Sequence, residues 1–202
     1  MKARVLAPAG ILLLVFIARA WLAGAGSTPD GQPALVDLQN TGTLRSIDAL
    51  KAEFNRAPEK MRVIILLAPS CPYCLKGATA IERILSKHRD YPVVIFNVWQ
   101  PILATDWGKP GTAVLHRLAD PRVRQFWDAE HRVARALEQS SEGRTLQPGC
   151  CFQNGIWWDL MAVYPPGAQW GDTLPEPILL EGTVDDAAPA FEALLTRPSG
   201  SD

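Results

Sequence analysis

This sequence has no excess of positive charge, and it contains few cysteines. The 202 residues include 20 Lys and Arg against 21 Asp and Glu, which gives a net charge of −1. A chain of this balance has no general positive field to hold a phosphate backbone, which argues against a nucleic-acid partner. The four cysteines are too few for a small disulfide-rich scaffold, and a chain of this length buries a core without such bonds.

Several motifs of common enzymes are also absent. The chain contains no G-x-S-x-G nucleophile elbow, no H-E-x-x-H zinc motif, no P-loop and no G-x-G-x-x-G dinucleotide motif. It shows no internal repeat and no coiled-coil heptads. Hydrolase and nucleotide-dependent chemistry therefore lack their usual signatures, and we expect no cofactor.

The N-terminus has the pattern of a secretory signal. Lys2 and Arg4 precede the apolar stretch Val5–Ala18, and small residues follow it. Two cleavage sites of the A-x-A type lie within residues 18–25. If neither is cut, the apolar region is just long enough to cross a bilayer as an anchor. We therefore interpret residues 1–26 as a signal peptide or signal anchor, which places the rest outside the cytoplasmic membrane, in a bacterial periplasm or secreted.

The remainder of the chain suits one domain after a short linker. Residues 27–33 are polar and contain Pro and Gly, which is typical of a linker, and we assign residues 34–198 to the domain. Cysteines in that domain meet an oxidising environment. Contact with the membrane is expected only through the N-terminal segment, if it stays uncleaved.

Strand and helix patterns alternate along the domain. Arg62–Ala68 and Val93–Val98 are continuous apolar runs of strand length, typical of strands buried on both faces of a parallel sheet, and Cys74–Lys87 between them has helical spacing. These three segments predict a β-α-β unit and an α/β fold, a central sheet covered by helices. Further strands are predicted at Leu35–Leu38, Ile156–Val163 and Ile178–Leu180, and further helices at Ile47–Phe54 (capped by Thr43 or Ser46), Pro121–Gln139 (capped by Asp120) and Asp185–Leu195.

The main chemical signal lies at the end of the first buried strand. Cys71 and Cys74 enclose Pro72 and Tyr73, and Ser70 precedes them in the turn after the strand. Cys71 falls where the helix cap belongs, so free backbone N–H groups and the positive end of the helix dipole face its sulfur. That environment lowers a thiol pKa from its usual value of about 8.5 and favours the thiolate that attacks disulfides.

The spacing of the two cysteines favours reversible redox chemistry over a structural role. Cysteines three residues apart on a helix share one face, at a Cα separation that a disulfide accepts. Closing so small a ring restrains the unfolded chain little, so the bond is poorly explained as a stabilising device. A zinc site would need a second ligand pair, for which only Cys150 and Cys151 are available, without the usual spacing.

The segment RVIILLAPSCPYCLKGATAIERIL resembles the active-site region of the thioredoxin superfamily, and its C-P-Y-C tetrapeptide is the one typical of glutaredoxins. The predicted export resembles that of membrane-tethered thioredoxin-like proteins of bacteria. The resemblance covers residues 62–98 and implies a thioredoxin-like three-layer α/β sandwich with a central mixed β-sheet. It also implies Cys71 as attacking thiolate, Cys74 as resolving thiol, and a disulfide-bearing protein or small thiol as the substrate. An upstream redox partner would complete the cycle.

One feature of the thioredoxin pattern has no obvious counterpart in the sequence. Thioredoxins place a cis-proline immediately before the strand that faces the dithiol, whereas Gly155 precedes the predicted strand Ile156–Val163. Pro148 lies earlier than this strand. Pro175 or Pro177 fits only if the strand at residues 178–180 is the equivalent one.

A second pair of cysteines, Cys150 and Cys151, precedes the same predicted strand. Adjacent Cα atoms are about 3.8 Å apart, closer than in usual disulfides, so a bond between the two would be easily reduced. Two interpretations stay open. In the first, the pair acts with Cys71 and Cys74 as a thiol relay or as a soft-metal site for Cu(I) or Hg(II). In the second, the two are small buried apolar residues, or one of them is bonded elsewhere.

Two tryptophans and an aspartate follow the second buried strand and form a candidate rim around the dithiol. Trp99, Asp106 and Trp107 leave that strand at the sheet edge where α/β proteins bind ligands. An aromatic rim would suit a protein or peptide substrate, whereas core packing is the alternative for each tryptophan. A proton acceptor near the thiols is one interpretation of the aspartate, and a capping or turn role, common for its T-D-W triplet, is the alternative.

Three functions are consistent with these patterns. The favoured one is an extracytoplasmic thiol-disulfide oxidoreductase that uses Cys71 and Cys74, in a direction that its reduction potential decides. A second is a soft-metal binding protein or chaperone that uses Cys71, Cys74, Cys150 and Cys151. A third is a redox-inert interaction module that keeps only the fold.

Overall fold

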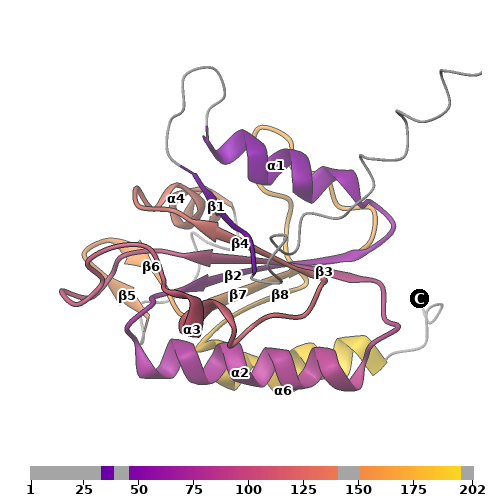
Figure 1. The fold of residues 1–202 in the computed structure, drawn as a ribbon. Coiled ribbons are helices and arrows are strands. Elements are labelled where there is room, and N and C mark those ends of the chain that lie inside the picture. Colours follow the sequence, from indigo (N-terminus) through magenta and orange to yellow (C-terminus); the bar gives the residue numbers. More distant parts are fainter. Residues whose placement is uncertain (1–32, 39–45, 141–150, 197–202) are drawn as a thin grey trace, which may run out of the picture.

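A six-stranded mixed β-sheet forms the centre of the molecule (Figure 1). The structure is a computed structural model that describes residues 33–38, 46–140 and 151–196. The sheet has the order β1-β4-β3-β2-β7-β8, in which the first four strands are parallel and the last two pair antiparallel. The strands are β1 (Leu35–Asp37), β2 (Met61–Leu67), β3 (Val93–Trp99), β4 (Val123–Trp127), β7 (Leu160–Tyr164) and β8 (Leu179–Gly182).

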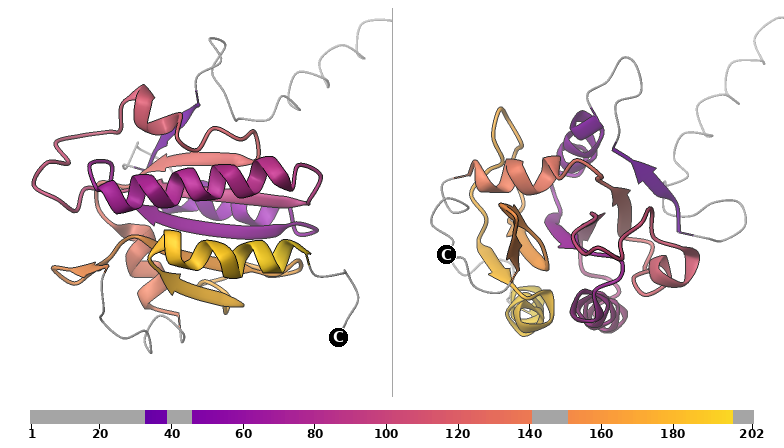
Figure 2. Two further views of the ribbon diagram at one scale, coloured as in Figure 1. Left: turned by 90° about the horizontal axis from the view of Figure 1, so that it is seen from below. Right: turned by 90° about the vertical axis from the view of Figure 1, so that its left-hand side faces the viewer.

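Helices cover both faces of this sheet. Figures 1 and 2 show α2 and α6 side by side on one face, with α1 and α4 on the other. A separate two-stranded hairpin lies at one end of the molecule. These elements are α1 (Ser46–Arg56), α2 (Pro72–Lys87), α3 (Thr112–Leu115), α4 (Arg132–Glu138), α6 (Val184–Thr196), β5 (Phe152–Gln153) and β6 (Ile156–Trp157). The predicted three-layer α/β sandwich with a central mixed sheet is confirmed.

Strand β2 separates two hydrophobic cores. All seven of its residues are buried. Val63 and Ile65 pack into the core shared with α2 and α6, whereas Ile64 and Leu66 pack into the core shared with α1 and α4. This two-sided burial explains the continuous apolar run in the sequence, because alternate side chains of a strand point to opposite faces.

The predicted helix Pro121–Gln139 is wrong for its first half. Residues Val123–Trp127 form β4, which pairs with β3 and with β1, and only Arg132–Glu138 are helical. The apolar residues that fit a helical stripe also fit a strand buried on both faces, and pairing with two neighbouring strands decides between the two. Asp120 caps no helix, because its carboxylate accepts the backbone N–H of Arg122 at 2.9 Å and forms an ion pair with the same residue.

The other predicted elements are present, with differences at their ends and a break in one strand, whereas α3 and β5 were not predicted. The predicted strand Ile156–Val163 is divided into β6 and β7, because Asp159 between them has a positive φ of 48°. Helix α2 begins at Pro72 rather than at Cys74, and α1 begins at Ser46, which therefore does not precede it as a cap. Thr43 lies outside the described residues.

The predicted export segment is not part of the described structure. Residues 1–26 and nearly all of the linker at residues 27–33 lie outside it. Within the described ranges, no helix combines the length and the apolar character that a membrane crossing requires. The division of the chain into signal, linker and domain stays a prediction.

Helices α2 and α6 approach each other closely at Gly77. A Cβ atom at this glycine would lie 2.9 Å from the Cβ atom of Val184 and 3.2 Å from the backbone nitrogen of Asp185. The absence of a side chain at Gly77 therefore sets how near α6 lies to the helix that carries the cysteines.

Replacing this glycine should destabilise the fold. Alanine favours a helix by about 1 kcal/mol over glycine, but overpacking costs about 1–3 kcal/mol. Since the overpacking cost exceeds the gain in helix propensity, we expect Gly77→Ala to lower the free energy of unfolding in urea by up to about 2 kcal/mol. Ser86→Ala, an exposed change on the same helix, serves as the control and should change it by less than about 0.5 kcal/mol. A Gly77→Ala protein about 1 kcal/mol more stable than the wild type, as helix propensity alone predicts, would contradict the close approach.

Candidate active site

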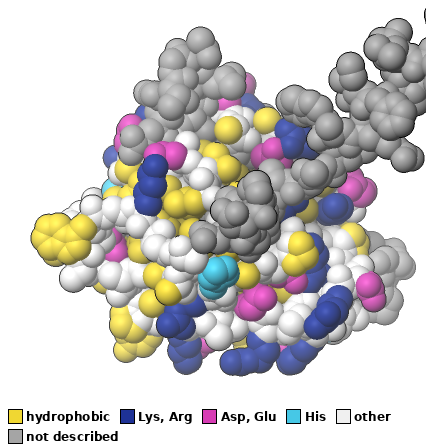
Figure 3. All heavy atoms as spheres, viewed as in Figure 1, with side chains coloured by type: hydrophobic (Ala, Val, Ile, Leu, Met, Phe, Trp, Pro, Cys, Tyr) yellow, Lys and Arg dark blue, Asp and Glu magenta, His cyan; other side chains and the backbone are white. Residues whose placement is uncertain are grey.

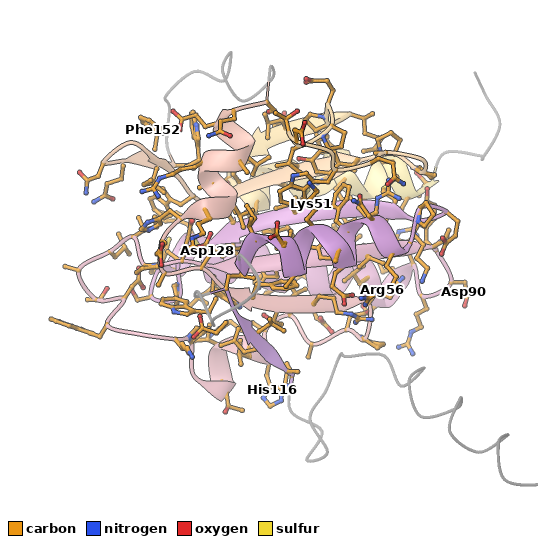
Figure 4. All side chains as sticks on the ribbon, turned by 90° about the horizontal axis from the view of Figure 1, so that it is seen from above. Lys51, Arg56, Asp90, His116, Asp128 and Phe152 are labelled. Carbon is orange, nitrogen blue, oxygen red and sulfur yellow. The ribbon has the colours of Figure 1, made fainter. Side chains whose placement is uncertain are left out.

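The carboxyl ends of three parallel strands meet at one edge of the sheet. Leu67, Trp99 and Trp127, which end β2, β3 and β4, lie in register across this edge. The C-P-Y-C segment follows β2 there, and the β5–β6 hairpin lies at the same end of the molecule (Figure 1). Figure 4 shows Phe152 of this hairpin and Asp128 toward that end, with Asp90 at the other. The predicted location of the dithiol is confirmed.

Cys71 is the N-cap residue of α2, as its position in the sequence predicts. Its sulfur accepts a hydrogen bond from the backbone N–H of Cys74 at 3.4 Å, and Pro72 occupies the first turn. A proline is tolerated there because a helix has no partner for its first N–H groups. The N–H donor and the positive end of the helix dipole both stabilise negative charge on the Cys71 sulfur.

Cys74 has a different environment from Cys71, although both are free thiols. Both side chains are buried, with 2% of the surface of Cys71 and 0% of that of Cys74 exposed. Burial strongly raises the pKa of the Cys74 thiol, and the negative charge of Asp159 raises it further, while the N–H of Ala68, 3.4 Å from the sulfur, opposes the rise. Cys74 is therefore a protonated, enclosed thiol next to a sulfur that accepts a backbone hydrogen bond at the start of the helix.

Asp159 is a buried carboxylate that the sequence analysis missed. It lies immediately before β7, and its Oδ1 accepts the backbone N–H of Val184 at 3.0 Å. Burial raises the pKa of its carboxyl group, and the charges of Asp185 and Asp186 act in the same direction. The sequence does contain a signal for this residue, a single aspartate inside an otherwise apolar strand pattern. A buried charge there costs free energy unless it is paired and hydrogen-bonded.

Asp159 also occupies the place where thioredoxins carry a cis-proline. No cis-proline occurs among the residues that the structure describes. Pro148 lies outside them, and Pro175 and Pro177 lie in the segment before β8, the edge strand. The strand beside β2 is β7, so the residue that precedes this strand is Asp159, whose charge raises the pKa of Cys74.

Asp106 ties a neighbouring loop to the turn before Cys71. Its Oδ1 accepts the N–H of Ser70 at 2.9 Å, and its Oδ2 accepts the N–H groups of Ile102 and Leu103 at 2.9 and 2.7 Å. Burial acts to raise the pKa of Asp106, but these hydrogen bonds outweigh it and hold the pKa below its ordinary value. The hydroxyl groups of Ser70 and Thr105 are also hydrogen-bonded. The capping role considered for Asp106 is the one the structure shows.

Two aromatic side chains near the dithiol are open to solvent. Trp107 is 91% exposed and Tyr73 is 70% exposed, and Trp107 follows directly on Asp106. Trp99 is fully buried, and its indole N–H donates to Oε1 of Gln125 at 2.6 Å, so its assignment to the rim is wrong. As the last residue of a central strand, Trp99 packs into the core with α2 and finds its polar partner inside.

Cys151 lies close to Asp159 and to the end of β8. Its carbonyl accepts the N–H of Trp158 at 2.9 Å, and its sulfur lies 3.4 Å from the position of a Cβ built on Gly182. Cys151 is disulfide-bonded, so its sulfur is not available as a thiolate ligand in this state. Cys150 lies outside the described residues. Within those residues, no three His, Cys, Asp or Glu side chains are grouped to hold a metal ion.

Comparisons with known proteins give similarity to solved structures alone. No protein-family model and no curated protein matches the sequence. The chain is similar to a thioredoxin-like protein solved in its oxidised form (16% identity, 68% of this chain and 78% of that chain, TM-score 0.43). It is also similar to a thiol:disulfide interchange protein from Bacteroides sp. (12%, 71% and 78%, TM-score 0.41) and to a secreted disulfide oxidoreductase of Mycobacterium tuberculosis (12%, 69% and 85%, TM-score 0.37).

The topology of the chain is thioredoxin-like in its own right. A β-α-β unit (β2, α2, β3) carries the cysteines at the start of its helix, an antiparallel pair (β7, β8) extends the sheet beside β2, and α6 packs next to α2. This is the class of fold that the C-P-Y-C segment implied.

Asp106 should stabilise the fold in a pH-dependent way. We expect Asp106→Ala to lower the free energy of unfolding by about 2–4 kcal/mol at pH 7, because three backbone N–H groups lose a charged acceptor. The pKa of Asp106 is depressed in the folded state, so its contribution is complete above the unfolded pKa of about 3.9 and is lost as the pH falls below that value.

Urea unfolding between pH 7 and pH 2 checks this expectation. The difference between wild type and Asp106→Ala should shrink at the acidic end of the series. Asp172→Asn, at an exposed aspartate, is the control and should match the wild type throughout. A difference that is small at pH 7, or that grows on acidification, would contradict the role of Asp106.

Proposed function

We propose that this protein is a thiol-disulfide oxidoreductase that acts outside the cytoplasm. The observation that carries the proposal is the pair of free thiols at the start of α2, with the Cys71 sulfur bound to the N–H of Cys74. This arrangement supports Cys71 as the nucleophile and Cys74 as the resolving thiol next to it. The proposed location rests on the basic and apolar N-terminal pattern in the sequence.

The reaction consists of two thiol-disulfide exchanges. The Cys71 thiolate attacks one sulfur of a substrate disulfide, and the substrate S–S bond breaks with release of the other sulfur as a thiolate. Cys74 then loses its proton and attacks the Cys71 sulfur, which releases the second substrate thiolate. The products are a Cys71–Cys74 disulfide and a reduced substrate. The reverse sequence oxidises a substrate dithiol, and the reduction potentials of the two partners set the direction.

Asp159 is the proposed proton acceptor for Cys74. The Cys74 thiol must lose its proton before it attacks, yet burial and the Asp159 charge both raise its pKa. A carboxylate whose own pKa is raised by burial is better matched to take up that proton than an ordinary aspartate. As the proton moves to Asp159, the charge that opposed ionisation of Cys74 disappears.

Tyr73 and Trp107 are the proposed contact residues for a protein substrate. Both are large aromatic side chains with most of their surface exposed, and one lies between the two cysteines. The other is held near the turn by Asp106, which binds Ser70. Exposed aromatic residues beside a reactive group favour a protein or peptide partner over a small thiol.

Trapping the mixed disulfide tests the proposed function. With Cys74→Ser, the first exchange should proceed and the second should stop, so that a covalent complex with a disulfide-bearing protein such as insulin accumulates on non-reducing gels. Cys71→Ser is the matched control and should form no complex and reduce no insulin. Equal complex formation by both variants, or none by either together with a wild type that reduces no disulfide, would overturn the proposal.

The Asp159 role predicts a slower second step. Asp159→Asn should keep the hydrogen bond from Val184 but lengthen the lifetime of the mixed disulfide by about 10-fold or more at pH 7. The effect should fade as the pH falls, because wild-type Asp159 then becomes protonated. Stopped-flow single-turnover kinetics would measure it.

A buried aspartate elsewhere provides a matched control. Asp128 is also buried, and its carboxylate accepts the N–H of Val133 at 2.8 Å. Asp128→Asn should leave the second step unchanged. Asp159→Asn should also be more stable than the wild type at neutral pH, since a raised pKa means that the folded state disfavours the charged carboxylate. An unchanged lifetime in Asp159→Asn would contradict the role of Asp159.

A further inference from the structure

A shallow groove runs along the outer surface of α2, and we name it the α2 groove. It has a volume of about 450 Å³ and begins at Pro72, the residue after Cys71. Leu75 contributes apolar surface, and Lys76, Arg83, Arg117 and Asp185 contribute charge. No step of the proposed reaction uses this surface.

Positive charge dominates the α2 groove, in a chain whose net charge is −1. Figure 3 shows Lys and Arg side chains gathered along the lower edge of the molecule, where Figure 1 places α2. The single carboxylate in the lining, Asp185, is already paired, since its Oδ2 lies 2.6 Å from Nζ of Lys76. One positive charge in the lining is thereby balanced within the protein.

The two arginines of the α2 groove have no carboxylate partner in the described part of the chain. Arg83 and Arg117 are both exposed, and neither takes part in a salt bridge there. Glu82, the carboxylate next to Arg83 in sequence, is engaged by the backbone N–H groups of Ala119 and Asp120 at 2.8 and 3.0 Å. Two guanidinium groups in one groove are thus free to bind an external acidic group.

The direction of the α2 groove relates it to the dithiol. From Pro72 to Arg83 the helix advances about 16 Å, at about 1.5 Å for each residue. An extended peptide covers that distance with about five residues. A substrate whose cysteine lies at Cys71 can therefore lay the residues next to that cysteine along the groove and reach Arg83.

We propose that the α2 groove binds an acidic segment of the substrate protein, next to the disulfide that Cys71 attacks. The inference rests on the proposed oxidoreductase function and names its substrate class: disulfides with Asp or Glu within about five residues of a cysteine. Carboxylates of such a segment pair with Arg83 and Arg117. The apolar surface of Leu75 contacts the methylene groups of the substrate's Asp and Glu side chains. The attraction speeds encounter and aligns the disulfide with Cys71.

Matched disulfide peptides test this proposal on the reduced full chain. One peptide carries Glu at the second to fifth positions after its cysteine, a second carries Gln there, and a third carries Lys. We expect the Glu peptide to react about 10-fold faster than the Gln peptide at low salt, and the Lys peptide to react slowest. The preference should weaken as the ionic strength rises.

Charge reversal assigns the preference to the groove. In the double variant Arg83→Glu, Arg117→Glu, the ratio of Glu-peptide to Gln-peptide rates should fall to about one or below. Lys51→Glu is the control, because Lys51 lies on α1 on the other side of the sheet (Figure 4). That variant should keep the wild-type ratio.

The outcomes separate this inference from the function on which it rests. Reaction of the wild type with the uncharged disulfide 2,2′-dithiodipyridine tests the dithiol itself. If that reaction occurs but Glu and Gln peptides react equally, or the double reversal keeps the wild-type ratio, the groove inference is wrong and the proposed function stands. If wild type fails to react with any disulfide, both are wrong.

Discussion

The hydrogen bond from the Cys74 backbone N–H to the Cys71 sulfur is the interaction on which the rest of the site depends. It exists because α2 begins directly after the buried strand β2, with Pro72 in its first turn. Three contacts keep that arrangement in place. Asp106 holds the turn at Ser70, Gly77 lets α6 pack against α2, and β7 brings Asp159 beside the second cysteine. The packing of the sandwich thus places the Cys71 sulfur at the start of α2.

The two cysteines have different environments although they lie only three positions apart in the sequence. Cys71 caps the helix at the sheet edge and keeps a small exposed surface, whereas Cys74 points into the core between α2 and the sheet. Water cannot solvate a thiolate at Cys74, so the charged form there needs help from a neighbour. Asp159, immediately before the strand antiparallel to β2, is the titratable group that we propose gives that help. The different proposed roles of the two cysteines, nucleophile and resolving thiol, are therefore a consequence of burial.

Local patterns were enough to predict the part of the molecule that carries the chemistry. The strand, turn and helix around Cys71 are encoded within about thirty residues, and their apolar periodicity, the proline and the cysteine spacing all agree. The short T-D-W turn likewise suggested the capping role of Asp106. Long-range pairing determined what the sequence could not show. Val123–Trp127 became a strand because β1 and β3 flank it, and Trp99 turned inward because Gln125 offers an acceptor.

Asp159 and the α2 groove depend on residues that are distant in sequence. Asp159 approaches Cys74 across 85 positions only because β7 pairs with β2, and the groove combines α2 with Arg117 and Asp185 from other segments. The spacing of residues in the sequence does not predict contacts between such distant segments. In this chain a carboxylate precedes the strand beside the dithiol, and positive charge flanks α2 on its outer side.

The rates at which the two cysteines are alkylated show whether the helix start activates one sulfur while the core encloses the other. The reduced full chain is treated with iodoacetamide at neutral pH for increasing times, quenched, and analysed by peptide mass spectrometry. We expect Cys71 to be modified first and Cys74 to be modified only after the protein is unfolded. Equal rates at the two residues, or earlier modification of Cys74, would contradict the claim that the helix start activates the Cys71 sulfur while the core encloses the Cys74 thiol.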